Sequence, residues 1–364
     1  MVIEILREKN ADFFVQHSGN ANFFYATKFR SSASMLYIVG VDGTELLILP
    51  EMELGRALRE SRVKEIASIE KLGYEEKFKE FGNPKKAFAE ILVERLKEGR
   101  AKKVLIPAEF PAFLAFELQK SFEVEVVENP FLKLRAVKRA EEVAKIRQNC
   151  ATLLKAFERF LRKLKPRKDF TCEFARSIIE KELYSLGLIA EETICSTGKL
   201  SADPHELGRG NVEDHLLVDV FPKNRTTGYY ADFTRTILIR KNAEIEEMLR
   251  AVIEAQRSAI SMLREGVNGR EVHNAVKDCL KAYGFKTKNG EGFIHSTGHG
   301  IGLEVHEEPR IGDVDVELKS GMVVTIEPGV YYKKFGGVRV EDVVLIRKND
   351  CEILTPYESF LGIM

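Results

Sequence analysis

Apolar residues recur at helical spacing in several stretches of the chain. From Pro84 to Gly99 this spacing predicts an amphipathic helix. From Arg139 to Leu164 it predicts a longer helix, which Pro166 stops. Three further helices are predicted in the same way, over about Thr171–Leu186, Ile245–Leu263 and Arg270–Tyr283.

Short apolar runs of strand length lie between these helices. In the first part of the chain they cover Met35–Gly40, Glu45–Pro50, Lys103–Pro107 and Phe122–Val127. The first two runs flank Asp42-Gly43, a dipeptide that is typical of a tight hairpin turn. In the second part the runs cover Leu216–Phe221, Tyr229–Arg240, Val323–Tyr332 and Val338–Arg347.

The order of these elements predicts two domains. Strands and helices alternate over residues 1–128, which we expect to form a small α/β domain. Asn129-Pro130 opens a linker over residues 129–138, and residues 139–364 form the second domain. There the order helix, helix, strand, strand occurs twice, so we expect an α+β fold with a pseudo-two-fold repeat.

The composition is that of a globular protein. With 44% hydrophobic residues, the chain of 364 residues is too apolar for a disordered protein. At about 100–200 residues per domain, its length fits two domains. The 56 basic residues balance the 56 acidic ones, so the net charge offers no electrostatic footprint for nucleic acid or for an anionic membrane. An enzyme or an interaction protein is therefore expected.

Neither a signal peptide nor a membrane-spanning segment is expected. Charged residues interrupt the start of the chain, and apolar runs such as Met35–Val41 fall far short of the ~18–20 residues of a membrane helix. Five cysteines, an odd number without a Cys-x-x-Cys pair, encode neither a disulfide framework nor a zinc knuckle. We expect reduced thiols in a cytoplasmic protein.

Four acidic residues interrupt or border the apolar runs of the second domain. They are Asp219, Asp232, Glu327 and Glu341, two in each half of the repeat. An unpaired charge inside a strand is costly. For one such acid, a solvated strand face or a structural ion pair would be the better explanation. Four of them favour a common partner, and divalent metal ions are the simplest one.

A segment rich in histidine and glycine lies between the two pairs of acids. Phe293–Arg310 contains three of the seven histidines, His295, His299 and His306. Its glycines let the backbone approach a ligand closely. A phosphate-binding loop is an alternative, but the pattern Gly-x-x-x-x-Gly-Lys-Ser/Thr is absent. A single histidine is usually structural, whereas three beside glycines indicate a site.

Taken in order, these motifs resemble the metal-dependent Xaa-Pro peptidases, prolidase and aminopeptidase P, of the pita-bread fold. The resemblance extends over essentially the whole chain, through a creatinase-like N-terminal domain and a catalytic C-terminal domain. It rests on Leu-Val-Asp219, Ala-Asp232-Phe-Thr-Arg-Thr, Thr-Gly-His299-Gly-Ile-Gly-Leu-Glu-Val-His306-Glu, Thr-Ile-Glu327-Pro-Gly and Val-Arg-Val-Glu341-Asp.

The resemblance implies a dinuclear metal site and a hydrolytic reaction. The implied ligands of two divalent ions are Asp219, Asp232, His299, Glu327 and Glu341. One imidazole among oxygen ligands suits Mn²⁺ or Co²⁺, and also Fe²⁺ or Zn²⁺. A metal-bridging hydroxide would attack the scissile carbonyl. Hydrolysis of short Xaa-Pro dipeptides by a homodimer is the leading expectation.

The resemblance also implies roles for residues around the metals. His205 and His306 match positions that contact the substrate and the developing tetrahedral centre, and Glu327, or a water molecule beside it, would pass a proton to the leaving proline nitrogen. Arg310 matches a position near the carboxylate of a dipeptide, although a structural salt bridge would explain it equally well. Residues that support the ligands and the bound substrate are expected to be Arg339, His295, Glu307 and Thr234, although a structural role would explain His295 equally well.

Two departures from the family pattern concern substrate preference. Asp219 and Asp232 are further apart than is usual in the family, which predicts a longer, reshaped hairpin between them. Glu308 stands where prolidases often carry a bulky aromatic residue. Aminopeptidase P activity on longer Xaa-Pro-Yaa peptides is therefore the alternative to dipeptidase activity.

Two other functions fit the same fold less well. A peptidase without proline selectivity would resemble the methionine aminopeptidases, which usually lack such an N-terminal domain. A non-catalytic binding module is least favoured, because such relatives typically lose metal ligands and all five are present here.

Overall fold

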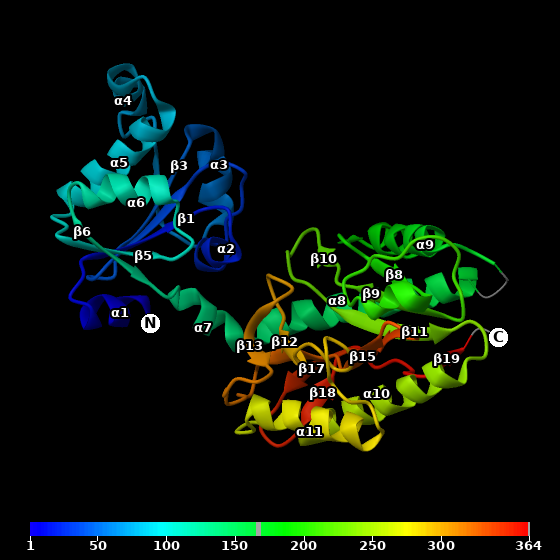
Figure 1. The fold of residues 1–364 in the computed structure, drawn as a ribbon. Coiled ribbons are helices and arrows are strands. Elements are labelled where there is room, and N and C mark those ends of the chain that lie inside the picture. The colour runs from blue at the N-terminus through cyan, green and yellow to red at the C-terminus, as the bar shows by residue number, and fades with distance from the viewer. Residues whose placement is uncertain (165–168, 363–364) are drawn as a thin grey trace. The chain divides into compact units, whose positions relative to one another are not determined.

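The computed structural model describes residues 1–164 and 169–362. Pro166, the expected stop of a long helix, lies outside these residues. The chain divides into two compact units, Met1–Leu134 and Arg135–Met364 (Figure 1). In the part of the chain that the structure describes, no helix is long and apolar enough to cross a membrane.

A six-stranded mixed sheet forms the centre of the first unit. Its strand order is β4-β3-β2-β1-β5-β6, in which β2 runs antiparallel to both neighbours and the other pairs are parallel. The strands are β1 (Phe13–His17), β2 (Leu36–Gly40), β3 (Glu45–Leu49), β4 (Glu65–Ser68), β5 (Lys103–Pro107) and β6 (Glu123–Val127). The predictions for β2, β3, β5 and β6 are confirmed.

Helices cover both faces of this sheet. Leu36 and Ile38 of β2 belong to the core that includes α5 and α6, whereas Tyr37 and Val39 belong to the core that includes α1, α2 and α3. The helices are α1 (Val2–Glu8), α2 (Ala21–Thr27), α3 (Glu51–Glu60), α4 (Tyr74–Phe81), α5 (Pro84–Glu98) and α6 (Ala112–Gln119). The helix predicted from Pro84 is α5. Residues 129–138, the predicted linker, contain the short helix α7 (Pro130–Ala136).

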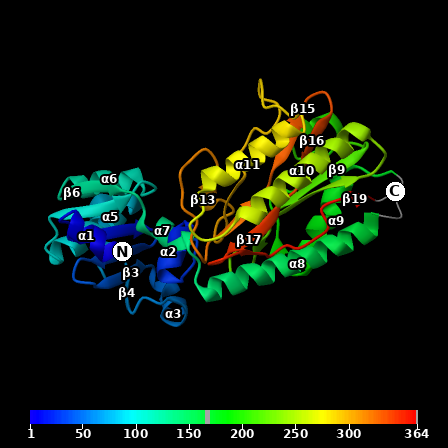
Figure 2. The ribbon, with the colours of Figure 1, turned by 90° about the horizontal axis from the view of Figure 1, so that it is seen from below.

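The second unit repeats one order of elements twice. Its helices are α8 (Ala140–Leu164), α9 (Cys172–Ser185), α10 (Ala243–Met262) and α11 (Gly269–Ala282). Thr171 and Asn242 cap α9 and α10 by accepting hydrogen bonds from backbone N–H groups. Each helix pair is followed by strands, and Figures 1 and 2 show that α8–α9 and α10–α11 flank these strands. The predicted pseudo-two-fold α+β fold is confirmed.

Two sheets meet in this unit. Their strand orders are β19-β11-β9-β8 and β13-β12-β14-β17-β18. The pairs β15-β16 and β10-β7 form two further, two-stranded sheets. The strands are β7 (Leu188–Ile189), β8 (Ile194–Ser196), β9 (His215–Val220), β10 (Lys223–Asn224), β11 (Phe233–Leu238), β12 (Gly298–Gly300), β13 (Glu307–Ile311), β14 (Val323–Ile326), β15 (Gly329–Tyr332), β16 (Gly336–Arg339), β17 (Asp342–Ile346), β18 (Cys351–Ile353) and β19 (Leu361–Gly362). A backbone bridge between Thr234 and Glu341 joins the two sheets.

Two predicted strands are wrong as single strands, because each is broken at an acidic residue. The run Val323–Tyr332 divides at Glu327 into β14 and β15, and the run Val338–Arg347 divides at Glu341 into β16 and β17. In both cases the two halves belong to different sheets. At the first break, Pro328 has no N–H to donate to a neighbouring strand. The acids therefore stand where the chain passes from one sheet to the other.

The hairpin between the two aspartates also differs from the prediction. The strand predicted over Tyr229–Arg240 begins only at Phe233, directly after Asp232. Between Asp219 and Asp232 the chain forms β10, which pairs with β7 rather than with β9 or β11. The longer hairpin thus contains a strand of its own.

A buried arginine connects the two sheets. Arg235 of β11 has no exposed surface, and its Nη2 lies 2.8 Å from Oδ1 of Asp342 in β17. Its Nη1 donates to the backbone carbonyls of Thr234 and Glu341. Removing one member of a buried ion pair leaves the other charge uncompensated, which is strongly destabilising.

We expect Arg235→Met to lower the free energy of unfolding by about 3–5 kcal/mol, as measured by urea denaturation. The matched control is Arg240→Met, because Arg240 is exposed and its partner Asp169 is more exposed still. That control should have only a small effect. Equal losses in the two variants would contradict the assigned role of Arg235.

Candidate metal centre

Five sequence-predicted residues come together where the two sheets meet. Asp219 lies in β9, opposite Thr234 of β11, and the backbone of Thr234 also bridges to Glu341. Asp232 directly precedes β11, His299 lies in β12, and Glu327 directly follows β14. We call this set the acid–histidine cluster: Asp219, Asp232, His299, Glu327 and Glu341.

The side-chain nitrogen and oxygen atoms of the acid–histidine cluster lie close enough together to bind a common ion. Nε2 of His299 lies 3.3 Å from Oε1 of Glu327 and 3.9 Å from Oδ2 of Asp232. Asp232, His299 and Glu341 can each direct one ligand atom into a space in which these atoms lie within 4.8 Å of one another. One ion could therefore be bound by all three.

The backbone fixes the proton on His299. Its Nδ1 lies 3.0 Å from the carbonyl oxygen of Gly300, and a carbonyl can only accept a hydrogen bond. Nδ1 therefore carries the hydrogen, and the lone pair of Nε2 is directed toward the carboxylates. Metal-binding histidines are commonly held in this way through the other ring nitrogen.

Burial and mutual repulsion disfavour ionisation of the acids. Burial, with the negative charges of neighbouring acids, raises the pKa of Asp232 and of Glu341 well above the usual range. Burial likewise raises the pKa of Glu327 to about 7, although the positive charge of Arg339 opposes this shift. Cations placed among the carboxylates would remove this penalty.

The residues of the acid–histidine cluster fit divalent metal ions. Oδ1 of Asp219 is buried and, within residues 1–164 and 169–362, has no hydrogen-bond partner. It is a carboxylate oxygen with a lone pair directed at no donor. Four carboxylates and one imidazole form a donor set that suits Mn²⁺, Co²⁺, Fe²⁺ or Zn²⁺.

Arg339 is a direct partner of the acid–histidine cluster. It is 3% exposed, and its Nη2 lies 2.6 Å from Oδ2 of Asp219. Its Nη1 donates to the hydroxyl of Tyr331 at 2.6 Å. Arg339 therefore holds Asp219, while its direct contact with a substrate stays a prediction. Tyr331 was not expected from the sequence, although a tyrosine in a buried apolar run usually needs a hydrogen-bond partner.

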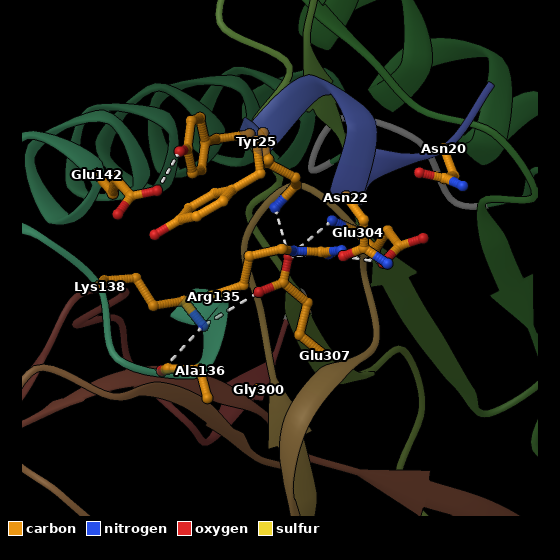
Figure 3. A network of polar contacts seen from close by, with 12 residues as sticks. Asn20, Asn22, Tyr25, Arg135, Ala136, Lys138, Glu142, Gly300, Glu304 and Glu307 are labelled. Carbon is orange, nitrogen blue, oxygen red and sulfur yellow. Dashed lines mark hydrogen bonds and ion pairs between the residues drawn. The ribbon is translucent and has the colours of Figure 1, made fainter. Parts of the chain in front are cut away.

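Thr234 and Glu307 were both expected to orient the ligands. The hydroxyl of Thr234 donates to Oε2 of Glu341 at 2.7 Å, as a supporting residue should. The carboxylate of Glu307 instead binds Arg135 and Lys138 (Figure 3). Its contacts thus connect the histidine segment to the start of the second unit.

Two of the predicted substrate-binding residues lie beside the acid–histidine cluster. The rings of His306 and His299 meet edge to face with their centroids 4.3 Å apart. Partial burial lowers the pKa of His306, and the neighbouring imidazoles of His299 and His205 lower it further. His205 is exposed in the loop that follows the 3₁₀ helix Gly198–Ala202. The structure thus brings His205, His306 and His299 near one another.

Arg310 and His295 differ in their surroundings. Arg310 of β13 pairs with His299 of β12, and cross-strand partners point to the same face of a sheet. Arg310 is exposed, and in the part of the chain that the structure describes no carboxylate lies within ion-pair distance of it. His295 contacts the hydroxyl of Tyr331 through Nε2 at 2.9 Å, and burial lowers the pKa of His295 to about 3.

A hydrogen-bonded row of serine, histidine and aspartate side chains could be found only in the structure, because no pattern in the sequence indicates it. Ser201 Oγ lies 2.9 Å from Nε2 of His215, whose Nδ1 lies 2.6 Å from Oδ1 of Asp214. The row resembles a hydrolytic triad, but Ser201 is 1% exposed and also contacts the backbone of Gly198 and Gly337. Its burial excludes attack on a peptide, so the row is structural and holds the helix that precedes the loop of His205.

Comparison with known proteins places the two units in known families. Residues 144–348 match the model of metallopeptidase family M24, and residues 1–137 match that of the Creatinase/Prolidase N-terminal domain. The Xaa-Pro dipeptidase of Pyrococcus furiosus is 31% identical over 99% of this chain and 98% of its own length. An uncharacterised peptidase of Methanocaldococcus jannaschii is 36% identical over 65% of this chain and 68% of its own.

Solved structures give the same picture. The prolidase from Pyrococcus furiosus superposes with a TM-score of 0.84 at 27% identity, covering 98% of this chain and 99% of that one. The X-Pro aminopeptidase from Thermotoga maritima superposes with a TM-score of 0.82 at 25% identity, covering 97% and 98%.

Metal binding should stabilise the protein through the acid–histidine cluster. With free Mn²⁺ at a hundredfold excess over its Kd, we expect the free energy of unfolding to rise by about 2.7 kcal/mol, as measured by urea denaturation with and without chelator. Asp232→Asn should lose most of this gain, and Asp278→Asn, at an exposed position of α11, should keep it. A gain of the same size in Asp232→Asn would contradict the site.

Proposed function

We propose, because this chain belongs to metallopeptidase family M24, that it is a metal-dependent Xaa-Pro dipeptidase that cleaves the bond between a residue Xaa and a following proline. Relatives named Xaa-Pro dipeptidase match it over nearly their whole length. The observation that carries the proposal is that Asp232, Glu327 and Glu341 converge with His299 in a buried cluster, with the charge of Asp219 close by. The same proposal includes a homodimer, which the family resemblance supports. It also includes a cytoplasmic location, which the free thiols support.

The acid–histidine cluster would hold two divalent ions, with Mn²⁺ or Co²⁺ preferred and Fe²⁺ or Zn²⁺ also compatible with the donor set. Bound divalent ions of this kind lower the pKa of a water molecule and polarise a carbonyl group. The hydrogen bond from Nδ1 of His299 to Gly300 keeps Nε2 available as a ligand. Arg339 and Thr234 hold the carboxylates of Asp219 and Glu341 in place.

Glu327 is the proposed proton carrier. Its side chain is 17% exposed, compared with 4% for Asp232, so it is the more accessible to a substrate. Expelling proline as an unprotonated amide anion is prohibitive, so its nitrogen must receive a proton as the bond breaks. A carboxylate oxygen of Glu327 would take up a proton from water and deliver it to this nitrogen.

His306 and His205 would bind the substrate carbonyl and the tetrahedral centre. His306 lies against the ring of His299, and His205 is close enough to affect the pKa of His306. Both imidazoles carry a ring N–H group that can donate to an oxygen as negative charge develops. Neither needs to be charged to do so, because a neutral imidazole still has one N–H.

Arg310 would bind the carboxylate of the dipeptide. It lies opposite His299 in the β12–β13 pair, and its exposed guanidinium is available for a bidentate, charge-assisted contact. The proline carboxylate is present in Xaa-Pro but is replaced by a peptide bond in Xaa-Pro-Yaa. Arg310 therefore favours dipeptides over longer peptides.

Activity on matched peptides tests the proposed function. The Mn²⁺- or Co²⁺-loaded protein should hydrolyse Leu-Pro faster than Leu-Pro-Gly and leave Leu-Gly largely intact, as followed by chromatography of the released amino acids. Faster hydrolysis of Leu-Pro-Gly would indicate an aminopeptidase P. The absence of hydrolysis of both proline peptides would contradict the proposal.

Arg310→Ala should raise the KM for Leu-Pro about ten- to a hundredfold, the range expected for a lost charge-assisted hydrogen bond. The KM for Leu-Pro-Gly should change much less. Arg257→Ala, at an exposed position of α10, is the control and should leave both values unchanged. Equal increases for the two peptides in Arg310→Ala would remove the proposed role.

A further inference from the structure

Glu307 follows His306 directly and is almost inaccessible to solvent. Its side chain is 4% exposed, and those of its two cationic partners, Arg135 and Lys138, are 3% and 2% exposed. Figure 3 shows the three side chains converging at the start of the second unit. A buried carboxylate needs its hydrogen-bonding capacity satisfied, and each of its oxygens has a charged partner here.

One oxygen of Glu307 binds the turn that leads to His306. Oε1 accepts hydrogen bonds from the backbone N–H groups of Leu303 at 2.7 Å and of Glu304 at 3.1 Å. A Cβ atom at Gly302 would lie 2.6 Å from Oε2 of Glu307, so only glycine leaves room for the carboxylate at that position. Residues 302–306 therefore close around this side chain.

The same carboxylate is fixed from a distant part of the chain. Nη2 of Arg135, 172 positions away in the sequence, lies 2.5 Å from Oε1, and Nζ of Lys138 lies 3.2 Å from Oε2. Burial by itself would raise the pKa of Glu307, but the charges of Lys138 and Arg135 outweigh burial and hold this pKa below its usual value. The ionised carboxylate of Glu307 thus links residues 302–306 to the buried side chains of Arg135 and Lys138.

The turn lies between the two histidines of the site. The backbone carbonyl of Gly300 orients His299, and the ring of His306 at the other end of the turn lies against the ring of His299. The carbonyl of Gly302 accepts a hydrogen bond from the backbone N–H of Tyr230, just before Asp232. Movement of the turn would therefore displace His306 relative to the acid–histidine cluster.

We propose that Glu307 is a positioning residue, whose ionised carboxylate, fixed by Arg135 and Lys138, holds the turn 302–306 and so places His306 for the hydrolytic reaction. The inference rests on the proposed function and deepens it. Glu307 acts through the turn and through His306, without contact to the substrate. A displacement of about 1 Å in such a group can cost about a hundredfold in rate.

Glu304 provides a matched control. Its Oε2 lies 2.6 Å from the same Nη2 of Arg135, but its side chain is 49% exposed, and the turn amides of Leu303 and Glu304 donate to Glu307 rather than to it. Glu304→Gln therefore removes one ion pair of Arg135 and leaves the link between Glu307 and the turn intact.

The kinetic test is a double-mutant cycle on Leu-Pro with the metal-loaded enzyme. Glu307→Gln should lower kcat about ten- to a hundredfold, with KM and metal content nearly unchanged. Combined with His306→Ala, it should cause little further loss, because residues that act through one another are not additive. Glu304→Gln should stay within about twofold of the wild type. Full additivity, or an unchanged kcat in Glu307→Gln, would overturn the proposal.

A second variant guards against simple misfolding. Glu307→Gln leaves Lys138 buried without its anionic partner, so the pair Glu307→Gln and Lys138→Met removes both charges together. This double variant should fold and bind metal like the wild type, yet keep the low kcat. Recovery of the wild-type kcat would mean that only the unpaired lysine was harmful, and would overturn the proposal.

Hydrogen exchange separates this inference from the proposed function, because it needs no substrate. The amides of Leu303 and Glu304 should exchange at least about tenfold faster in Glu307→Gln than in Glu304→Gln, since the side chain that accepts their hydrogen bonds is no longer held by Arg135 and Lys138. Faster exchange in a chain without activity on Xaa-Pro peptides would refute the function and keep the positioning role. Unchanged exchange in an active chain would refute the positioning role alone.

Discussion

The mutual repulsion of carboxylates in one buried cluster is the constraint on which the second unit depends. Burial, together with the negative charges of neighbouring acids, raises the pKa of Asp232, Glu327 and Glu341. Protons taken up by these acids, or cations bound among them, relieve this repulsion. The acids lie near the ends of strands or where the chain passes between sheets, and not on a solvated face, so water does not offset the repulsion between their charges.

Buried positive charges set the geometry around this cluster. Arg339 binds Asp219, and Arg235 binds Asp342 and the carbonyl of Glu341, so two cations fix the backbone next to the proposed ligands. Glu307 with Arg135 and Lys138 does the same for the turn before His306. Each of these charged side chains is paired with a specific partner, and such a network orders the site before a substrate binds.

Much of the fold and of the candidate site could be predicted from local sequence. Apolar runs located four of the six strands of the first unit, and in the second unit those that carry or border the acids, β9, β11 and β14–β17. Acids within these runs identified the cluster. The breaks at Glu327 and Glu341 could not be predicted, because an apolar run has the same pattern whether it stays in one sheet or crosses to another. The partners of Glu307 and Asp219 are far apart in the sequence, and only folding brings Arg135 and Arg339 to them.

We propose that the acid–histidine cluster binds two divalent ions between the sheets. Anomalous diffraction from crystals grown with Mn²⁺ measures it most directly, because the signal locates the metal without reference to activity. We expect two strong peaks about 3.5–4 Å apart, enclosed by Asp219, Asp232, His299, Glu327 and Glu341. Peaks elsewhere, or none among these side chains, would contradict it.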